Sequence, residues 1–269
     1  MEPVKPVRVP DLRVMKQRGE KIVMLTAYDA SMAALLDRAG VDVLLVGDSL
    51  GMVIMGCENT LPVTMPAMLH HVRAVSRGAQ RALVVADMPF MSFQVSVAQA
   101  VRNAGRLIQQ GGAAAVKIEG GRPVLETVTR LVEAGIPVMG HLGLTPQAVH
   151  RLGGFRRQAR DQQDAEQLLE DAVALERAGA FALVVESIPA DVAREVTAAL
   201  GIPTIGIGAG PHCDGQVLVS YDAFGLYQGP APPFVKQYAR LGEVIVEATR
   251  AYAEDVRQGR FPPAKEAGQ

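Results

Sequence analysis

The chain has 269 residues and a formal net charge of -1, and this charge balance gives no sign of binding to nucleic acid or to an anionic membrane surface. Hydrophobic residues make up 49% of the chain and charged residues 20%, which is enough for a large core, while no apolar run approaches the ~20 residues of a membrane-spanning helix. Only two cysteines and no apolar segment at the N-terminus argue against disulfides and a signal peptide, and they favour a cytoplasmic location.

Short apolar runs recur along the chain, and each ends in a turn. The run at residues 43–46 is apolar at every position, which is typical of a strand buried on both faces of a parallel sheet. Read in order, the runs predict strands at residues 21–26, 43–46, 82–86, 114–118, 136–140, 182–185, 203–207 and 216–219.

Helical patterns separate most of these runs. Thr64 followed by Met65 and Pro66 is typical of a helix start, with a hydroxyl cap and a proline in the first turn. Several of the helices end on Ala-Gly or Leu-Gly directly before a strand, which indicates a repeated unit. The predicted helices span residues 10–18, 31–39, 64–77, 96–110, 123–134, 164–178, 189–200 and 236–258.

This alternation of strands and helices indicates right-handed βαβ units and a parallel sheet. Eight such units in about 200 residues favour a closed (β/α)8 TIM barrel over an open doubly wound sheet. We therefore predict an α/β fold, a TIM barrel with a short N-terminal helix and a C-terminal helical extension. No segment is typical of a linker, so we predict a single catalytic domain over residues 1–269.

Polar residues follow the ends of the predicted strands two to six. In a (β/α)8 barrel the C-terminal strand ends face one pocket, so these side chains are expected to lie close together. Three carboxylates on three successive strands are a candidate site for magnesium, which prefers oxygen ligands and keeps open positions for water or substrate. The strand-end residues are Asp48, Asp87, Glu119, His141 and Glu186.

Simpler roles for these carboxylates are also open at this point. Asp48 could cap the helix that follows it, and Glu119 could pair with Arg122. Several like charges around one pocket, however, require either a cation or raised pKa values. The pattern alone leaves capping and metal binding as alternatives.

Two further charged residues have positions that suggest a function. Lys117 lies two residues before Glu119, so strand alternation puts both on the same face, where the lysine could bind an anion such as a carboxylate or pair with a neighbouring Asp. Glu186 stands apart from the three carboxylates. A carboxylate that is not tied to the metal could act as a base on a carbon acid, and the alternative is a salt bridge to an arginine of the loops.

Several stretches of the chain closely resemble ketopantoate hydroxymethyltransferases. The matching stretches run in order over nearly the whole chain, from about residue 12 to residue 227. They are LTAYD at 25–29, VGDSLGM at 46–52, DMPF at 87–90, VKIEG at 116–120, GHLGLTP at 140–146, GIGAG at 206–210 and DGQVLV at 214–219.

The resemblance implies a (β/α)8 barrel that transfers a hydroxymethyl group from 5,10-methylenetetrahydrofolate to 3-methyl-2-oxobutanoate. The product is 2-dehydropantoate, on the route to pantothenate and coenzyme A. It also implies a cytoplasmic homo-oligomer, typically a decamer, with Mg2+ as the metal. By motif position, Asp48, Asp87 and Glu119 would be the ligands of that metal or lie close behind them.

The same resemblance implies roles around the substrate. Asp48, Ser49, Asp87 and Lys117 would contact the oxoacid, and Glu186 would accept its proton. The oxoacid can chelate magnesium through its carboxylate and keto oxygens, and the metal would then stabilise the enolate formed when the proton leaves.

One stretch departs from the family pattern. In residues 153–160 the pattern has an apolar residue near Arg157 and a glycine near Ala159. The departure concerns the conformation of this loop and its contribution to the folate side of the site.

Two other functions are carried as alternatives. One is a magnesium-dependent enolate enzyme of the phosphoenolpyruvate mutase and isocitrate lyase type, whose usual Lys-Lys-Cys-Gly-His loop is absent from this sequence. The other is a non-catalytic barrel that binds an oxoacid, which would be favoured by loss of Glu186 or of a metal carboxylate, and all of these are present.

Overall fold

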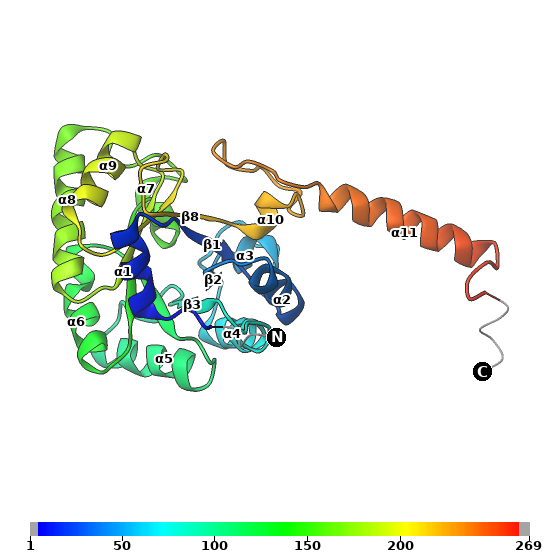
Figure 1. Ribbon diagram of the computed structural model, residues 1–269, viewed down its shortest axis with the longest axis horizontal. Helices are drawn as coiled ribbons and strands as arrows, with labels where there is room; N and C mark the ends of the chain where they lie inside the picture. The colour runs from blue at the N-terminus through cyan, green and yellow to red at the C-terminus, as the bar shows by residue number, and fades with distance from the viewer. Residues whose placement is uncertain (1–4, 264–269) are drawn as a thin grey trace. The chain divides into compact units, whose positions relative to one another are not determined.

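The computed structural model describes residues 5–263 of the chain. Within them, eight parallel strands form a closed barrel in sequence order, and β8 pairs with β1 to complete it (Figure 1). The predicted (β/α)8 barrel and its eight strands are thus confirmed. The strands are β1 (Ile22–Thr26), β2 (Val43–Val46), β3 (Leu83–Asp87), β4 (Ala115–Glu119), β5 (Val138–Gly143), β6 (Ala182–Glu186), β7 (Thr204–Ile207) and β8 (Gly215–Leu218).

The strand ends place the candidate residues at one end of the barrel. Asp87, Glu119 and Glu186 are the last residues of β3, β4 and β6. Asp48 is the second residue after β2. β5 is longer than predicted, so His141 is a residue of the strand itself rather than the residue that follows it.

Helices surround the barrel and lie between its successive strands, except between β7 and β8, as Figure 1 shows. The Thr64 hydroxyl accepts a hydrogen bond from the Ala67 backbone N–H, which confirms the predicted cap. The predicted helices around the barrel are α1 (Val9–Arg18), α2 (Ala30–Arg38), α4 (Met65–Gly78), α5 (Val97–Gln109), α6 (Leu125–Glu133) with the 3-10 turn η1 (Arg122–Val124) before it, α8 (Gln162–Arg177) and α9 (Ala190–Ala199).

Two loops at the C-terminal end contain short helices that the sequence did not predict. α3 (Leu50–Val53) begins directly after Asp48 and Ser49. The 3-10 turn η2 (Pro146–Ala148) and α7 (Val149–Leu152) follow β5. Both loops are therefore more ordered than their composition suggests, and they hold site residues in place.

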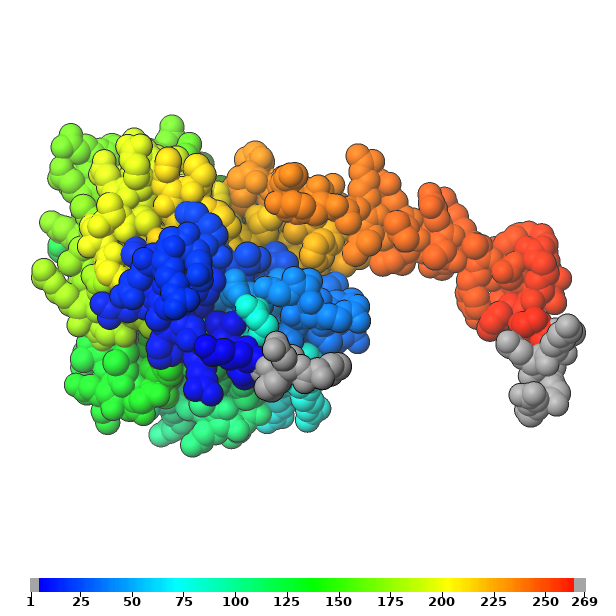
Figure 2. All heavy atoms as spheres, in the orientation of Figure 1, coloured from blue at the N-terminus to red at the C-terminus, as the bar shows by residue number. Residues whose placement is uncertain are grey.

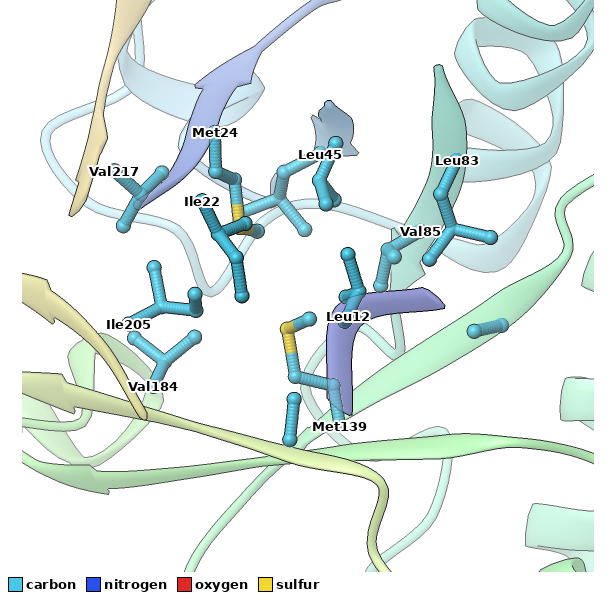
Figure 3. Close-up of a cluster of buried hydrophobic side chains, with 13 residues drawn as sticks. Leu12, Ile22, Met24, Leu45, Leu83, Val85, Met139, Val184, Ile205 and Val217 are labelled. Carbon is cyan, nitrogen blue, oxygen red and sulfur yellow. The ribbon is translucent and has the colours of Figure 1, made fainter. Parts of the chain in front are cut away.

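Apolar side chains fill the N-terminal end of the barrel. Leu12 of α1 is fully buried and belongs to one cluster with Ile22, Met24, Val85 and Met139 (Figure 3). α1 lies on the face of the barrel that is turned toward the viewer in Figure 2. Burying a leucine of this kind contributes about 1.5–3 kcal/mol, so α1 closes this end of the barrel and stabilises it.

The chain divides into two compact units, residues 1–218 and 219–269. The first contains all the barrel strands. The second contains α10 (Ser220–Ala223) and α11 (Leu241–Arg257), which is the predicted C-terminal helical extension with a later start. That the whole chain is one domain stays a prediction. Among the described residues, no helix is both long and apolar enough to cross a membrane.

Candidate active site

Three carboxylates are buried at the C-terminal end of the barrel. Asp48, Asp87 and Glu119 are each less than 9% exposed. The backbone N–H of Asp48 donates to Oδ2 of Asp87 over 3.0 Å, which ties the loop after β2 to the end of β3. The site predicted from strand ends is therefore assembled here, although the metal-binding role of the carboxylates stays a prediction.

Lys117 is buried beside these carboxylates. Its Nζ lies 2.8 Å from Oδ1 of Asp87, so the predicted ion pair to a neighbouring Asp is present. Burial lowers the pKa of Lys117, but the charges of Asp87, Glu119 and Asp48 outweigh it and raise that pKa above its ordinary value. The ammonium group is consequently charged at neutral pH and offsets part of the negative charge around it.

Asp48 shows the electrostatic cost of this arrangement. Burial is the largest cause that raises its pKa well above the ordinary value, and the charges of Asp87 and Glu119 add to it. The charge of Lys117 and a hydrogen bond from Gln147 act in the opposite direction. A cation in this position would relieve the repulsion, because it favours the ionised form of every carboxylate near it.

The donor atoms at this end fit magnesium. Oδ1 of Asp87 is buried and pairs with the Lys117 ammonium, whose Nζ lies 2.8 Å away. No three or more His, Cys, Asp or Glu side chains of residues 5–263 form a cage that could hold an ion by themselves. Magnesium does not need such a cage, since it usually takes one or two carboxylates together with water and substrate oxygens. Asp48, Asp87 and Glu119 are all buried at this end, and their binding of magnesium stays a prediction.

His141 links the carboxylate group to Glu186. Its Nε2 lies 3.0 Å from Oε2 of Glu186, and its Nδ1 lies 3.2 Å from Nζ of Lys117 and 3.5 Å from Oε1 of Glu119. Burial and the Lys117 charge lower the pKa of His141, but the two glutamates raise it more, so the net shift is upward. His141 is thus positioned to orient Glu186, and the arginine partner considered for Glu186 is not the contact that the structure shows.

The backbone around Glu186 is held in a strained conformation. Ser187 has φ of 51°, which side chains rarely adopt. The Leu144 N–H donates to the Glu186 carbonyl over 2.8 Å, and a Cβ at Gly143 would lie only 2.3 Å from that same oxygen. The end of β6 and the loop after β5 therefore pack closely, and the glycine at position 143 makes this approach possible.

The loop at residues 153–160, which differs from the pattern expected from the resemblance, also contacts the end of β6. The Gln158 N–H donates to the Ser187 carbonyl over 2.9 Å, and Nη2 of Arg157 donates to the Ile188 carbonyl over 3.2 Å. Ala159 is buried and has φ of 49°, a backbone conformation that favours glycine. Ala159, where the resemblance led us to expect glycine, is thus strained in this chain, and Arg157, where we expected an apolar residue, donates a hydrogen bond.

Ser49 is held by Tyr28 at the edge of the site. The two hydroxyl groups lie 2.8 Å apart, and the Tyr28 carbonyl lies 2.6 Å from Nδ1 of His71. A Cβ at Gly47 would lie 2.8 Å from the Ser49 hydroxyl oxygen, so any side chain at position 47 would displace that hydroxyl. Tyr28 lies in one of the stretches that match the family, but no role for it was predicted from the sequence.

The simpler roles considered for the carboxylates do not hold. Arg122 pairs with Glu170 and Asp171 rather than with Glu119. The short helix α3 has Ser49 at its N-cap position, and the Asp48 side chain accepts instead from Gln147. These carboxylates are therefore directed into the site and not into helix capping or surface pairing.

Gln147 is the contact residue that sequence reasoning missed. It lies in η2, is 8% exposed, and its side chain donates to Oδ2 of Asp48 over 2.9 Å while its backbone N–H donates to Oε2 of Glu119 over 3.0 Å. A glutamine in a loop belongs to no sequence pattern that would predict such a contact. The only available signal was its place next to Thr145 and Pro146 in a stretch that matches the family.

A family model described as ketopantoate hydroxymethyltransferase matches residues 6–264. The chain belongs to this family. It is 60% identical to the 3-methyl-2-oxobutanoate hydroxymethyltransferase of Moorella thermoacetica, with 95% of each chain covered. It is 59% identical to the enzyme of the same name from Syntrophus aciditrophicus, with 93% of this chain and 92% of that one covered.

Solved structures with the same fold are far less similar in sequence. One is a phosphonopyruvate hydrolase in complex with oxalate and Mg2+, with a TM-score of 0.63, 14% identity, and coverage of 97% of this chain and 91% of that chain. Another is 2,3-dimethylmalate lyase, a member of the PEP mutase/isocitrate lyase superfamily, with a TM-score of 0.60, 16% identity, and coverage of 97% and 91%. These similarities concern the fold alone.

Proposed function

We propose that this chain transfers a hydroxymethyl group from 5,10-methylenetetrahydrofolate to 3-methyl-2-oxobutanoate, giving 2-dehydropantoate for the synthesis of pantothenate and coenzyme A. One observation carries the proposal. The buried group of Asp48, Asp87, Glu119 and Lys117 lies at the C-terminal end of the TIM barrel of a chain whose family is shown. Glu186 lies at the end of β6, at the same end of the barrel. This is where active sites of (β/α)8 barrels lie.

Magnesium is the metal that we propose for this site, held by Asp48 and Asp87 with Glu119 close by. When bound, the ion would supply Lewis acidity toward the keto oxygen of the oxoacid. The raised pKa of Asp48 supports the proposal, because the cluster carries more negative charge than Lys117 alone offsets.

Glu186 is the group that we assign to proton removal from the branched carbon of the oxoacid. Its side chain is 15% exposed and so can be reached by a substrate, whereas the His141 side chain is only 3% exposed. Since Oε2 faces His141, we assign the proton to Oε1. His141 would hold the carboxylate in place while the electron pair of the broken C–H bond moves toward the keto group.

The residues that we assign to contacts with the oxoacid are Asp48, Ser49, Asp87 and Lys117. The Lys117 ammonium is fixed by Asp87 and would offset the charge of the substrate carboxylate. The Ser49 hydroxyl is fixed by Tyr28 and would donate to a substrate oxygen. In the overall transfer, the deprotonated carbon would bond to the methylene carbon while both C–N bonds of that carbon to the folate break, and water would supply the hydroxyl group. The proton taken by Glu186 and the second proton of the water would end on the two folate nitrogens, which leaves tetrahydrofolate.

Product analysis tests this function. The protein is incubated with 3-methyl-2-oxobutanoate, 5,10-methylenetetrahydrofolate and Mg2+, and the products are followed by NMR and mass spectrometry. We expect 2-dehydropantoate to form and to depend on the folate and the metal. Proton exchange on the oxoacid without this product would favour an enolate enzyme of the phosphoenolpyruvate mutase and isocitrate lyase type. Binding of the oxoacid without exchange or product would favour the non-catalytic barrel.

We also propose that the chain works as a cytoplasmic homo-oligomer, a decamer. The family resemblance supports this, together with the absence of a disulfide pattern in the sequence. Size-exclusion chromatography with light scattering measures the mass of the assembly, and a mass of one or two chains would contradict the decamer.

A further inference from the structure

Gln147 contacts groups from three neighbouring parts of the barrel end. Its Nε2 donates to Oδ2 of Asp48 after β2 and to the Met88 carbonyl after β3, each over 2.9 Å. Its backbone N–H donates to Oε2 of Glu119 at the end of β4, over 3.0 Å. One residue of the loop after β5 thus holds one oxygen of each of two carboxylates.

The orientation of the Gln147 amide is fixed by a chain of hydrogen bonds. The Phe93 N–H donates to Oε1 of Gln94 over 3.3 Å, so Nε2 of Gln94 is directed at Oε1 of Gln147, to which it donates over 3.1 Å. Turning the Gln147 amide over would place its oxygen against a carboxylate and a carbonyl, both of which are acceptors. The Gln147 nitrogen therefore always faces Asp48.

This arrangement affects which carboxylate oxygens remain available. The oxygens held by N–H donors are Oδ2 of Asp48, Oδ2 of Asp87 and Oε2 of Glu119, and Gln147 supplies two of these three donors. Because the amide is neutral, it orients the carboxylates without adding a charge that would compete with a cation. Groups that orient metal ligands in this way commonly change metal affinity by about 10- to 100-fold.

We propose that Gln147 is a positioning residue for the cation site, and that Gln94 sets the orientation of its amide. This inference rests on the proposed function only in taking Asp48 and Glu119 as groups of a metal site. The alternative is that Gln147 merely connects the loops through Met88. The two roles differ in their effect on metal affinity.

The test uses Mn2+ as the metal probe and measures its binding to the full chain by EPR, in the absence of substrates, with Mg2+ as competitor. Gln147→Met has a similar length but no amide, and we expect it to weaken Mn2+ binding about tenfold or more. Gln94→Leu leaves Gln147 in place but frees its amide to turn, so we expect a smaller loss, about threefold to tenfold.

Asn103 provides a matched control. It is a buried amide that donates to the Ser92 carbonyl over 2.7 Å, in the same loop as Gln94, and it contacts no carboxylate of the site. Asn103→Leu should lower the thermal midpoint of unfolding and leave Mn2+ affinity within about twofold of wild type. The KM for the oxoacid should rise in the two glutamine variants and stay unchanged in this one.

The outcomes separate this inference from the proposed function. If wild type binds Mn2+ and both glutamine variants bind it equally well, the positioning role is wrong while the metal site stands. If wild type itself does not bind Mn2+ or Mg2+, the proposed metal site is wrong. Should Gln147→Met fail to fold, Gln94→Leu carries the test, and unchanged affinity in that variant overturns the inference.

Discussion

The two ends of the barrel are built from the same strands but hold opposite kinds of side chain. In β3, Val85 belongs to the apolar cluster and Asp87, two residues later, belongs to the charged site. In β5 the same step leads from Met139 to His141. Side chains two residues apart on a strand point to the same face, so β3 and β5 each contribute a side chain to both layers of the barrel interior.

The difference between these layers shows where stability and function reside. The apolar layer with Leu12 is stabilised by burial, whereas the charged layer pays for desolvation and repulsion, as the raised pKa of Asp48 shows. A substitution in the first layer should change stability with little effect on activity. A substitution in the second should change activity most.

The largest effect is expected for Lys117→Met. It removes the ammonium that neutralises Asp87 and leaves the carboxylates without a positively charged partner, so product formation should fall about 100- to 1,000-fold. Breaking such a buried pair should also cost about 3–5 kcal/mol in the free energy of unfolding. Turnover assays and urea unfolding measure the two effects.

An ion pair of equal length at the opposite end provides the control. Lys16 of α1 lies 2.8 Å from Asp214, and both side chains are partly exposed. The Lys16 ammonium also donates to the Thr197 carbonyl, so Lys16→Met should lower the free energy of unfolding by about 1.5–3 kcal/mol and leave turnover within about twofold. Equal losses of activity in the two lysine variants would contradict the division between the ends.

Leu12→Ala should disturb the packing of the apolar layer and leave the charged layer intact. The leucine is fully buried against the strands, so its truncation should cost about 2–5 kcal/mol in the free energy of unfolding. At temperatures where the variant stays folded, its turnover should remain within about twofold of wild type. A large fall in turnover with unchanged stability would show that α1 acts on the site and not on the core.

The charged layer should also give the metal-free protein a characteristic pH dependence. The pKa of Asp48 is raised above its ordinary value of 3.8 in the folded state, so above that pH the native state binds more protons at this carboxyl than the unfolded state does. The free energy of unfolding should therefore fall as pH rises from about 4 through the raised pKa.

Asp48→Asn tests this sign, because it removes the titrating group. With EDTA present, the variant should gain stability relative to wild type as pH increases from about 4. Added Mg2+ should reduce the difference by stabilising wild type. Urea unfolding at a series of pH values measures both, and a difference that shrinks with rising pH in EDTA would refute the burial and repulsion described for Asp48.

The smallest effect is expected at Ala159, where the family pattern has glycine. Its φ of 49° costs an alanine about 1 kcal/mol, while glycine adds entropy to the unfolded chain. The net gain for Ala159→Gly should be about 0.5 kcal/mol, measured by urea unfolding. Ala180→Gly, at a buried alanine whose φ is not positive, should instead destabilise the protein, because glycine adds entropy to the unfolded chain and relieves no strain here.

The sequence predicted the barrel and most of its charged layer, because both follow from local patterns. An apolar run followed by a carboxylate fixes where Asp87 and Glu119 lie, and strand alternation places Lys117 beside them. Gln147 could not be found in this way, since its contacts depend on how the loops after β2, β3 and β5 meet. The strain at Ser187 and the in-strand position of His141 likewise depend on packing between neighbouring strands.

The central claim is that Glu186 removes a proton from an oxoacid held in the charged layer. Its most direct test incubates the protein with 3-methyl-2-oxobutanoate and Mg2+ in heavy water, without folate, and follows the proton on the branched carbon by NMR. We predict exchange that requires the metal and that Glu186→Gln abolishes. No exchange with wild type, or undiminished exchange with the variant, would contradict this assignment.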